Sequence, residues 1–184
     1  MTQTIALADL LSASRIIAVR DAVVMTLAAR FPEVQVKAHP GKLDMADVLA
    51  AGTFTAPSIH VALARLKNEE RSSGAQDLPV HFRAYVVAEQ KMVAGSAVPA
   101  DEIGYALMLG LLDALELPDV SRWGVENISC PEGAEGEPLF TLKIFEKGTV
   151  YYVVTWRQTL LYEGVELANL GGPWTAPGTW GTGP

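Results

Sequence analysis

Cysteine is nearly absent from this sequence, because Cys130 is the one cysteine among 184 residues. A single thiol excludes an internal disulfide framework and fits a reducing compartment. Long apolar runs are also missing, since no stretch approaches the roughly 20 apolar residues that a membrane-spanning helix needs. The first residues, MTQTIALADLL, lack a basic leader with a cleavage site, so we expect no signal peptide. The sequence therefore predicts a protein without disulfides and without a membrane segment.

Basic residues are in the minority, with 14 Lys and Arg against 21 Asp and Glu and a formal net charge of −7. Phosphate neutralisation needs clustered Lys and Arg, so this balance argues against a generic nucleic-acid binder. A hydrophobic content of 49% with 19% charged residues is typical of a globular protein that buries a full core. We expect one domain over 1–163, followed by a tail rich in Gly, Pro and Trp over 164–184.

Catalytic and metal-binding constellations are also missing. His39, His60 and His81 are not at metal-ligand spacing on a predicted helix. His60 and His81 face each other across a predicted hairpin, which gives two ligands at best. Cys130 has no predicted helix N-terminus or histidine partner, so we interpret it as a small buried hydrophobe. No glycine-rich stretch has the phosphate-loop pattern. We expect no enzymatic activity, no metal and no cofactor.

Two amphipathic helices stand out. Residues 14–30 carry apolar side chains at steps of three or four, and Phe31-Pro32 ends the pattern. Residues 99–117 begin at Pro99, carry Asp101 and Glu102 in the first turn, and end before Pro118. Residues 44–51 have the pattern of a short helix ended by Gly52, with a partly ordered loop as the alternative.

Strand patterns fill most of the remaining chain. They cover 34–38, 58–66, 80–88 and 123–130, and the second and third form a candidate hairpin joined by a polar segment. The segment 131–138 is acidic and glycine-rich, so we expect a flexible loop there. The polar segment 67–77 is longer than a hairpin needs, and it is either functional or a solvated tip.

The stretch 139–161 predicts two long strands joined at Glu146-Lys147-Gly148. A two-residue turn and a three-residue loop are both possible. The three-residue loop pairs Ile144 with Val150, Leu142 with Tyr152 and Phe140 with Val154, which collects the large apolar side chains on one face. A one-residue slip would invert every side chain, and Gly148 suits the left-handed position of the longer loop. We favour the three-residue version.

These elements predict an α+β fold, with an antiparallel or mixed sheet, two main helices on one face and a long hairpin near the C-terminus. The other face is expected to stay partly apolar because of Tyr151, Val153 and Leu161. An uncovered apolar face of this kind requires a partner.

Charged and aromatic segments outside the predicted core are further candidates for contacts. Glu132, Glu135 and Glu137 cluster in the predicted acidic loop, which is either solvated or lines a channel with negative charge. The polar tip at 67–77 offers Glu69, Glu70 and Arg71 as contact residues. In the tail, Trp174 and Trp180 are suited to anchor in a pocket of a neighbouring subunit or of their own domain, and a disordered end is the alternative.

Several segments, taken in order over about residues 15–162, resemble the small tail proteins of Mu-like tailed phages and prophages. These segments are Arg20-Asp21-Ala22-Val23-Val24 through Ala29-Arg30-Phe31-Pro32, Ala56–Leu63, Phe82–Ala88, Ala106–Leu115, Trp123-Gly124 and Val153-Val154-Thr155-Trp156-Arg157-Gln158. Within that group the chain looks like the tail terminators.

The resemblance implies a structural virion protein of the tail and neck, assembled in the cytoplasm of the bacterial host. It implies a homo-oligomeric ring, usually of six subunits, that caps the tail tube and provides the docking surface for the head–tail connector. DNA would pass through such a ring without specific binding. It carries over no catalytic residue. Two alternatives remain open, namely another neck or head–tail joining protein and a small-ligand or regulatory binding domain.

Overall fold

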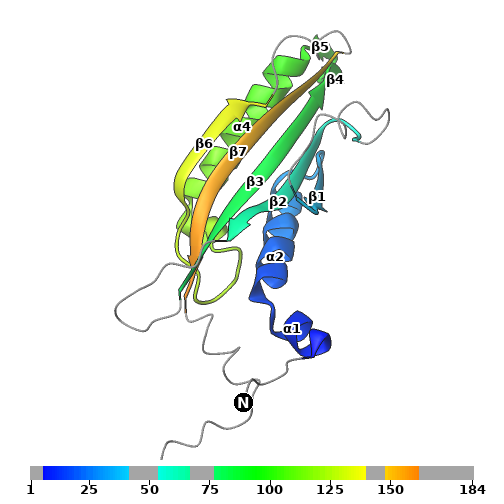
Figure 1. Ribbon diagram of the computed structural model, residues 1–184. Helices are drawn as coiled ribbons and strands as arrows, with labels where there is room; N and C mark the ends of the chain where they lie inside the picture. The colour runs from blue at the N-terminus through cyan, green and yellow to red at the C-terminus, as the bar shows by residue number, and fades with distance from the viewer. Residues whose placement is uncertain (1–5, 42–53, 67–76, 140–147, 162–184) are drawn as a thin grey trace, which may run out of the picture.

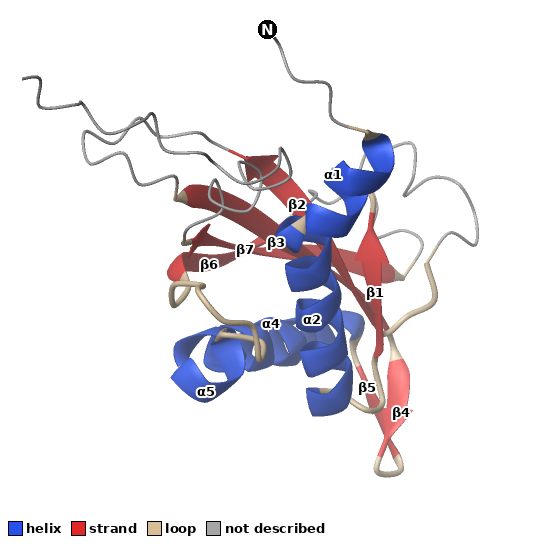
Figure 2. Cartoon of the chain, turned by 90° about the horizontal axis from the view of Figure 1, so that it is seen from below, coloured by secondary structure: helices blue, strands red, loops and turns tan. Residues whose placement is uncertain are grey.

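The computed structural model describes residues 6–41, 54–66, 77–139 and 148–161 of the chain. In that part a five-stranded sheet forms the centre, and helices cover one of its faces (Figures 1 and 2). From edge to edge the strands are β1 (Gln35–His39), β2 (Ser58–Leu66), β3 (Leu78–Glu89), β7 (Thr149–Leu160) and β6 (Glu132–Pro138). Strands β1 and β2 are parallel, and the other neighbouring pairs are antiparallel. The predicted α+β class with a mixed sheet is therefore confirmed.

The remaining described elements are helices and one small hairpin. The helices are α1 (Leu7–Ala13), α2 (Arg15–Arg30), α4 (Ala100–Glu116) and α5 (Pro118–Ser121), and the hairpin joins β4 (Lys91–Val93) to β5 (Ser96–Val98). The two predicted long helices are confirmed within a residue at each end, and β2 has the predicted bounds. The sequence patterns predicted neither α1 nor the β4–β5 hairpin. The predicted helix at 44–51 lies outside the described residues.

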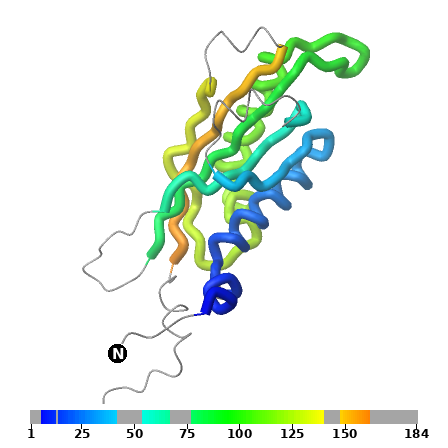
Figure 3. Tube along the Cα trace, turned by 45° about the vertical axis from the view of Figure 1, so that its right-hand side comes forward, coloured from blue at the N-terminus to red at the C-terminus, as the bar shows by residue number. Residues whose placement is uncertain are grey.

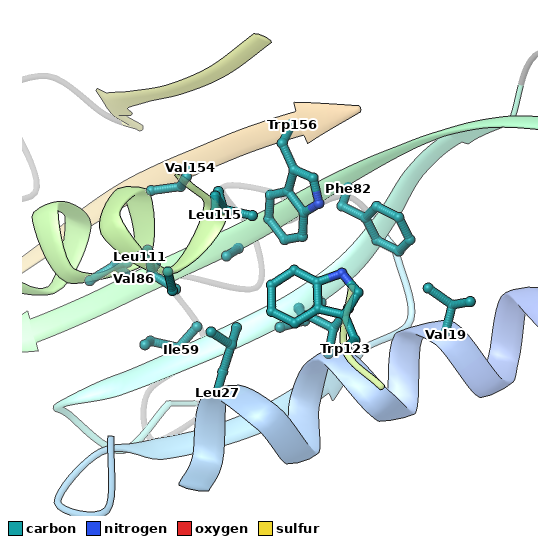
Figure 4. Packing of buried hydrophobic residues seen from close by; sticks show 14 of the residues in the cluster. Val19, Leu27, Ile59, Phe82, Val86, Leu111, Leu115, Trp123, Val154 and Trp156 are labelled. Carbon is teal, nitrogen blue, oxygen red and sulfur yellow. The ribbon is translucent and has the colours of Figure 1, made fainter. Parts of the chain in front are cut away.

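The hydrophobic core lies between the sheet and its two long helices (Figure 4). Helix α2 contributes Val19, Val23 and Leu27, which recur at helical spacing and are at most 1% exposed. Helix α4 contributes a second buried stripe that includes Leu111 and Leu115. On the sheet, strands β3 and β7 send alternate side chains into this core.

Helix α4 approaches strand β7 closely because Gly104 lacks a side chain. A Cβ atom at Gly104 would lie 2.7 Å from Cδ2 of Tyr152, closer than non-bonded carbon atoms come. The Tyr152 ring is 3% exposed and also packs against Tyr105, with ring centroids 5.2 Å apart. Burial is the main cause that raises the pKa of Tyr152, and its hydrogen bond with Tyr105 adds to this.

The amide of Gln158 fastens the segment after α5 to the end of β7. Its Oε1 accepts hydrogen bonds from Nε1 of Trp123 at 2.8 Å and from Nε1 of Trp156 at 3.0 Å. Its Nε2 donates to the carbonyl oxygens of Ser121 at 2.8 Å and Ser129 at 2.9 Å. A glutamine amide has two acceptor and two donor positions, and here all four are used in a site that is 1% exposed.

Arg15 fixes the start of α2 on the same end of the sheet. Nη1 of Arg15 donates to the carbonyl oxygen of Leu161 at 2.9 Å. Nη2 donates to the backbone carbonyl oxygens of Glu126 at 2.7 Å and Asn127 at 3.3 Å. A cation at a helix N-terminus is unfavourable for the helix dipole, but these carbonyl oxygens compensate it. The junction between α1 and α2 is therefore held firmly against the body of the molecule.

The predicted strand at 123–130 is wrong. Trp123, Gly124 and Asn127 have φ angles of 56°, 68° and 53°, which belong to turns rather than strands. Among the described residues its one β-bridge to the sheet is the isolated pair Ile128 and Leu160, which is too little for a strand. The predicted interior position of Cys130 is also wrong, because the thiol is exposed and lies 3.9 Å from Nη2 of Arg122.

The strand predicted to pair with β7, over 140–144, is not its neighbour at the described positions, because β7 lies between β3 and β6. Tyr152 pairs with Val86 on one side and with Pro138 on the other, so no edge of the strand is free for Leu142 at that position. Likewise Val154 pairs with Ala84 and Gly136, which excludes the predicted partner Phe140. The loop expected over 131–138 is instead strand β6, and residues 140–147 lie outside the described part of the chain.

Replacing Gln158 by leucine is expected to destabilise the fold by about 3 kcal/mol or more, because two indole N–H groups and two carbonyl groups lose their partners inside the protein. Urea unfolding followed by tryptophan fluorescence measures this change. Gln35→Leu, at an exposed position of β1, is the matched control and should shift stability by less than about 0.5 kcal/mol. Equal effects of the two substitutions would contradict the role of the Gln158 amide.

Candidate functional site

The face of the sheet opposite the long helices, here called the outer face, has an apolar centre that the chain itself covers. Ala62, Tyr85 and Val153 form a small cluster there, and each is at most 3% exposed. Phe54, Leu139 and Tyr151 pack around this cluster. The expectation that the outer face stays apolar and uncovered is therefore wrong at its centre, because segments outside the regular strands fold over it.

The predicted apolar contact residues consequently have different surroundings. Val153 is buried and unavailable to a partner, and Tyr151 is partly buried against the same cluster. Burial raises the pKa of the Tyr151 hydroxyl, and the charge of Glu89 adds to this. Leu161 is partly buried at the end of β7, where its N–H donates to the carbonyl oxygen of Asn127 at 2.8 Å. The structure does not bring these three side chains together as one exposed patch.

His60 lies on the outer face near the start of β2, in a closed aromatic environment. It is 6% exposed, its ring centroid is 4.6 Å from that of Phe54, and Oγ of Ser58 lies 2.9 Å from Nε2. Burial lowers the pKa of His60 to about 4, with further contributions from the charges of His39 and Lys37. His60 is therefore neutral at physiological pH and sealed from substrates, which fits a structural role.

The predicted juxtaposition of His60 and His81 is wrong. His60 pairs with Tyr85 across β2 and β3, whereas His81 pairs with Arg65, so the two imidazoles lie at separate places on the outer face. A bulge in β2 between Leu63 and Arg65 shifts the register. Within the described residues there is no group of three or more His, Cys, Asp or Glu side chains that could hold a metal ion. No helix in that part of the chain is long and apolar enough to span a membrane.

Near the end of β2 the outer face forms an open charged groove with a volume of about 630 Å³. Four strands provide its lining, and cationic side chains from β2, β3 and β7 face carboxylates from β6. The charged lining residues are Arg65, Arg83, Arg157, Glu132, Glu135 and Glu137, and the imidazole of His81 lies among them.

Strand register places the opposite charges of this charged groove side by side. Glu132 pairs with Arg157, and their side chains form an ion pair. One step along the sheet, Oγ1 of Thr155 donates to Oε1 of Glu135 at 3.4 Å. Arg83 lies on the other side of Thr155 in the same row. Because both signs are present over three neighbouring strands, the groove matches a partner that carries both charges.

The three predicted channel glutamates therefore belong to an edge strand rather than to a loop. All residues of β6 are exposed. The strand has a register irregularity between Glu132 and Glu135, three carboxylates and Pro138 near its end, and features of this kind protect an edge against unwanted strand pairing. A partner would therefore contact β6 through side chains more readily than through its backbone.

Sequence patterns pointed to the glutamates of the charged groove but missed its arginines. The available signal was the alternation along β3 and β7, which places Arg83 and Arg157 on the face opposite the core. Arg65 was hidden by the bulge that precedes it. The other predicted contact residues, Glu69, Glu70, Arg71, Trp174 and Trp180, lie outside the described residues.

Comparison with known proteins gives no family assignment: no family model matches the chain, and no curated protein matches it. The candidate site therefore rests on its own geometry.

The free energy of unfolding should fall as the pH is lowered from about 6.5 to about 4. His60 stays neutral in the folded chain over most of this range, whereas the unfolded chain takes up a proton at this histidine. The contribution of His60 to the free energy of unfolding is therefore fully present above pH 6.5 and decreases as the pH falls to about 4. The contribution is at most about 3 kcal/mol. Urea unfolding at neutral pH and at about pH 5 measures it, with His60→Gln as the variant that lacks this titration. A variant that loses as much stability as the parent chain would contradict the assignment.

Proposed function

We propose that this chain is a structural subunit of a phage tail, a terminator that assembles into a ring, caps the tail tube and offers a docking surface to the head–tail connector. Its work is non-covalent assembly, without a catalytic residue or cofactor. It would be assembled in the host cytoplasm and would reside in the neck of the virion. The order of the resembling segments and the character of the outer face support this proposal.

The observation that carries the proposal is the charged groove on the sheet face that the long helices leave open. Arginines and glutamates from four strands lie there in neighbouring rows, and most of them are at the surface. Such a surface gives orientation and specificity to a protein contact, because every misplaced partner would meet a like charge. A docking subunit that must join two different protein assemblies needs this type of surface.

The arrangement of charges also bears on the path of DNA. A row made of Glu132, Glu135 and Glu137 alone would repel a polyanion and suit a channel wall. The ion pair of Glu132 with Arg157 neutralises part of this row. We therefore favour a protein contact as the role of the charged groove. Glu135 and Glu137 of β6 would in addition suit a position at the wall of the channel.

A small-ligand binding domain is the second candidate, because a groove of about 630 Å³ lies within the size range of ligand sites. Its lining would select a ligand with both an acidic and a basic group. Thermal stabilisation by such a compound, with no change in the mass of the particle, would favour this candidate over assembly.

Negative-stain microscopy of the purified chain, alone and mixed with tail tubes, tests the proposal. Rings in the free protein and rings at tube ends are the expected images. A chain that stays monomeric in the presence and absence of tubes would contradict the terminator role. Rings that bind connector particles but never tubes would instead identify another neck protein.

Reversing the charge of the edge strand β6 should weaken the binding of a partner protein without unfolding the chain. In the double variant Glu135→Lys with Glu137→Lys, both substitutions are at exposed positions of the charged groove. We expect the affinity for the tube or connector to fall at least about tenfold, measured by co-sedimentation. Glu116→Lys, an exposed glutamate at the end of α4, is the control. Equal binding by the double variant and the control would exclude the groove as the docking surface.

A further inference from the structure

Large apolar side chains remain exposed at two separate places that the charged groove does not include. On α1, Leu7, Leu10 and Leu11 are 71%, 41% and 57% exposed. On the β4–β5 hairpin, Met92 and Val93 are 63% and 47% exposed. At each place the exposed apolar side chains are neighbours, and an exposed apolar patch of this kind marks a contact site.

Helix α1 has the character of an arm. Its leucines are spaced three and four residues apart, so they share one face of the helix. Seven residues are too few for a stable helix in water without a surface to pack on. The arm leaves the body at Ser14, directly before the Arg15 side chain that anchors α2. The hydrogen bonds of Arg15 fix the point at which α1 leaves the body. Within the described part of the chain the three leucines of α1 stay exposed.

The β4–β5 hairpin likewise projects exposed apolar side chains. Ala94 and Gly95 form its turn with φ angles of 49° and 86°, which is the geometry of a tight two-residue hairpin. A two-stranded hairpin is marginal by itself in water. Its residues from Lys91 to Ala97 are all exposed, and they include no acidic side chain.

The arm and the hairpin lie at opposite ends of the long axis of the molecule, as Figures 1 and 3 both show. One chain therefore cannot join its own α1 to its own hairpin. Their charges are also opposite, because Asp9 is the charged residue of α1 and Lys91 is that of the hairpin. Apolar character, opposite charge and opposite location together fit a contact between two copies.

We propose that α1 of one copy packs against the β4–β5 hairpin of the next copy, with Leu7, Leu10 and Leu11 on Met92 and Val93 and with Asp9 near Lys91. This inference rests on the proposed function and names the subunit contact that builds the ring. Donor and acceptor are different surfaces, so the contact is heterologous, and its repetition closes a ring when the rotation between copies permits.

Crosslinking tests the contact in the full-length chain. Cys130 is exposed, so Cys130→Ser is the background into which Leu11→Cys and Met92→Cys are introduced together. A short bismaleimide should then produce a ladder of covalent multimers, whereas Leu11→Cys alone has no second thiol at the contact and should stay monomeric on a denaturing gel. The pair Leu11→Cys with Leu109→Cys probes the other exposed apolar surface, on α4, where Leu109 is 61% exposed. A ladder from that pair and none from the first would overturn the proposal.

Substitutions give a second, independent readout. Leu7→Ser with Leu11→Ser should raise the dissociation constant between subunits at least about tenfold, and Asp9→Lys should weaken assembly until Lys91→Asp is added. Met25→Ser is the matched control, because Met25 is 73% exposed but belongs to neither surface. Rings that persist in the leucine variant would overturn the contact and leave the terminator role standing. A parent chain that forms no oligomer would refute both.

Discussion

The amide of Gln158 is the interaction on which the arrangement of the outer face depends. By binding two indoles and two carbonyl groups, it holds the segment around Trp123 and Ser129 against the end of β7. The chain leaves this anchor only three residues before β6 begins at Glu132. The glutamates of β6 therefore enter the sheet beside Arg157 and Thr155, and the charged groove follows from a buried polar network on the opposite side of the sheet.

Periodicity predicted the elements whose burial is one-sided. The stripe of Val19, Val23 and Leu27 and the alternation of β2 both depend on a single buried face, which a sequence displays directly. Strand β6 was missed because Gly, Glu and Pro have low strand propensity, and pairing with β7 overrides that preference. The segment 123–130 resembles a strand in its sequence, but Trp123 is buried by the Gln158 network rather than by sheet alternation.

The candidate site was predictable only in part, for a related reason. Alternation assigned Val153 to the face opposite the core correctly, but the cover provided by Phe54 and Leu139 comes from residues outside the regular strands and leaves no periodic signal. The arginines of the charged groove are separated by up to about ninety positions along the chain, from Arg65 to Arg157. Only strand order brings them together, and single-strand patterns do not contain that order.

The chain has two proposed contact surfaces, a polar groove for unlike partners and an apolar arm with its acceptor for like partners. The central claim is that copies of the chain bind one another head to tail. Native mass spectrometry of the intact protein tests this most directly. The account predicts a single closed particle at a fixed multiple of the 19.7 kDa chain mass, with six copies as the number that the resemblance implies. A particle of one chain mass at every concentration would contradict it.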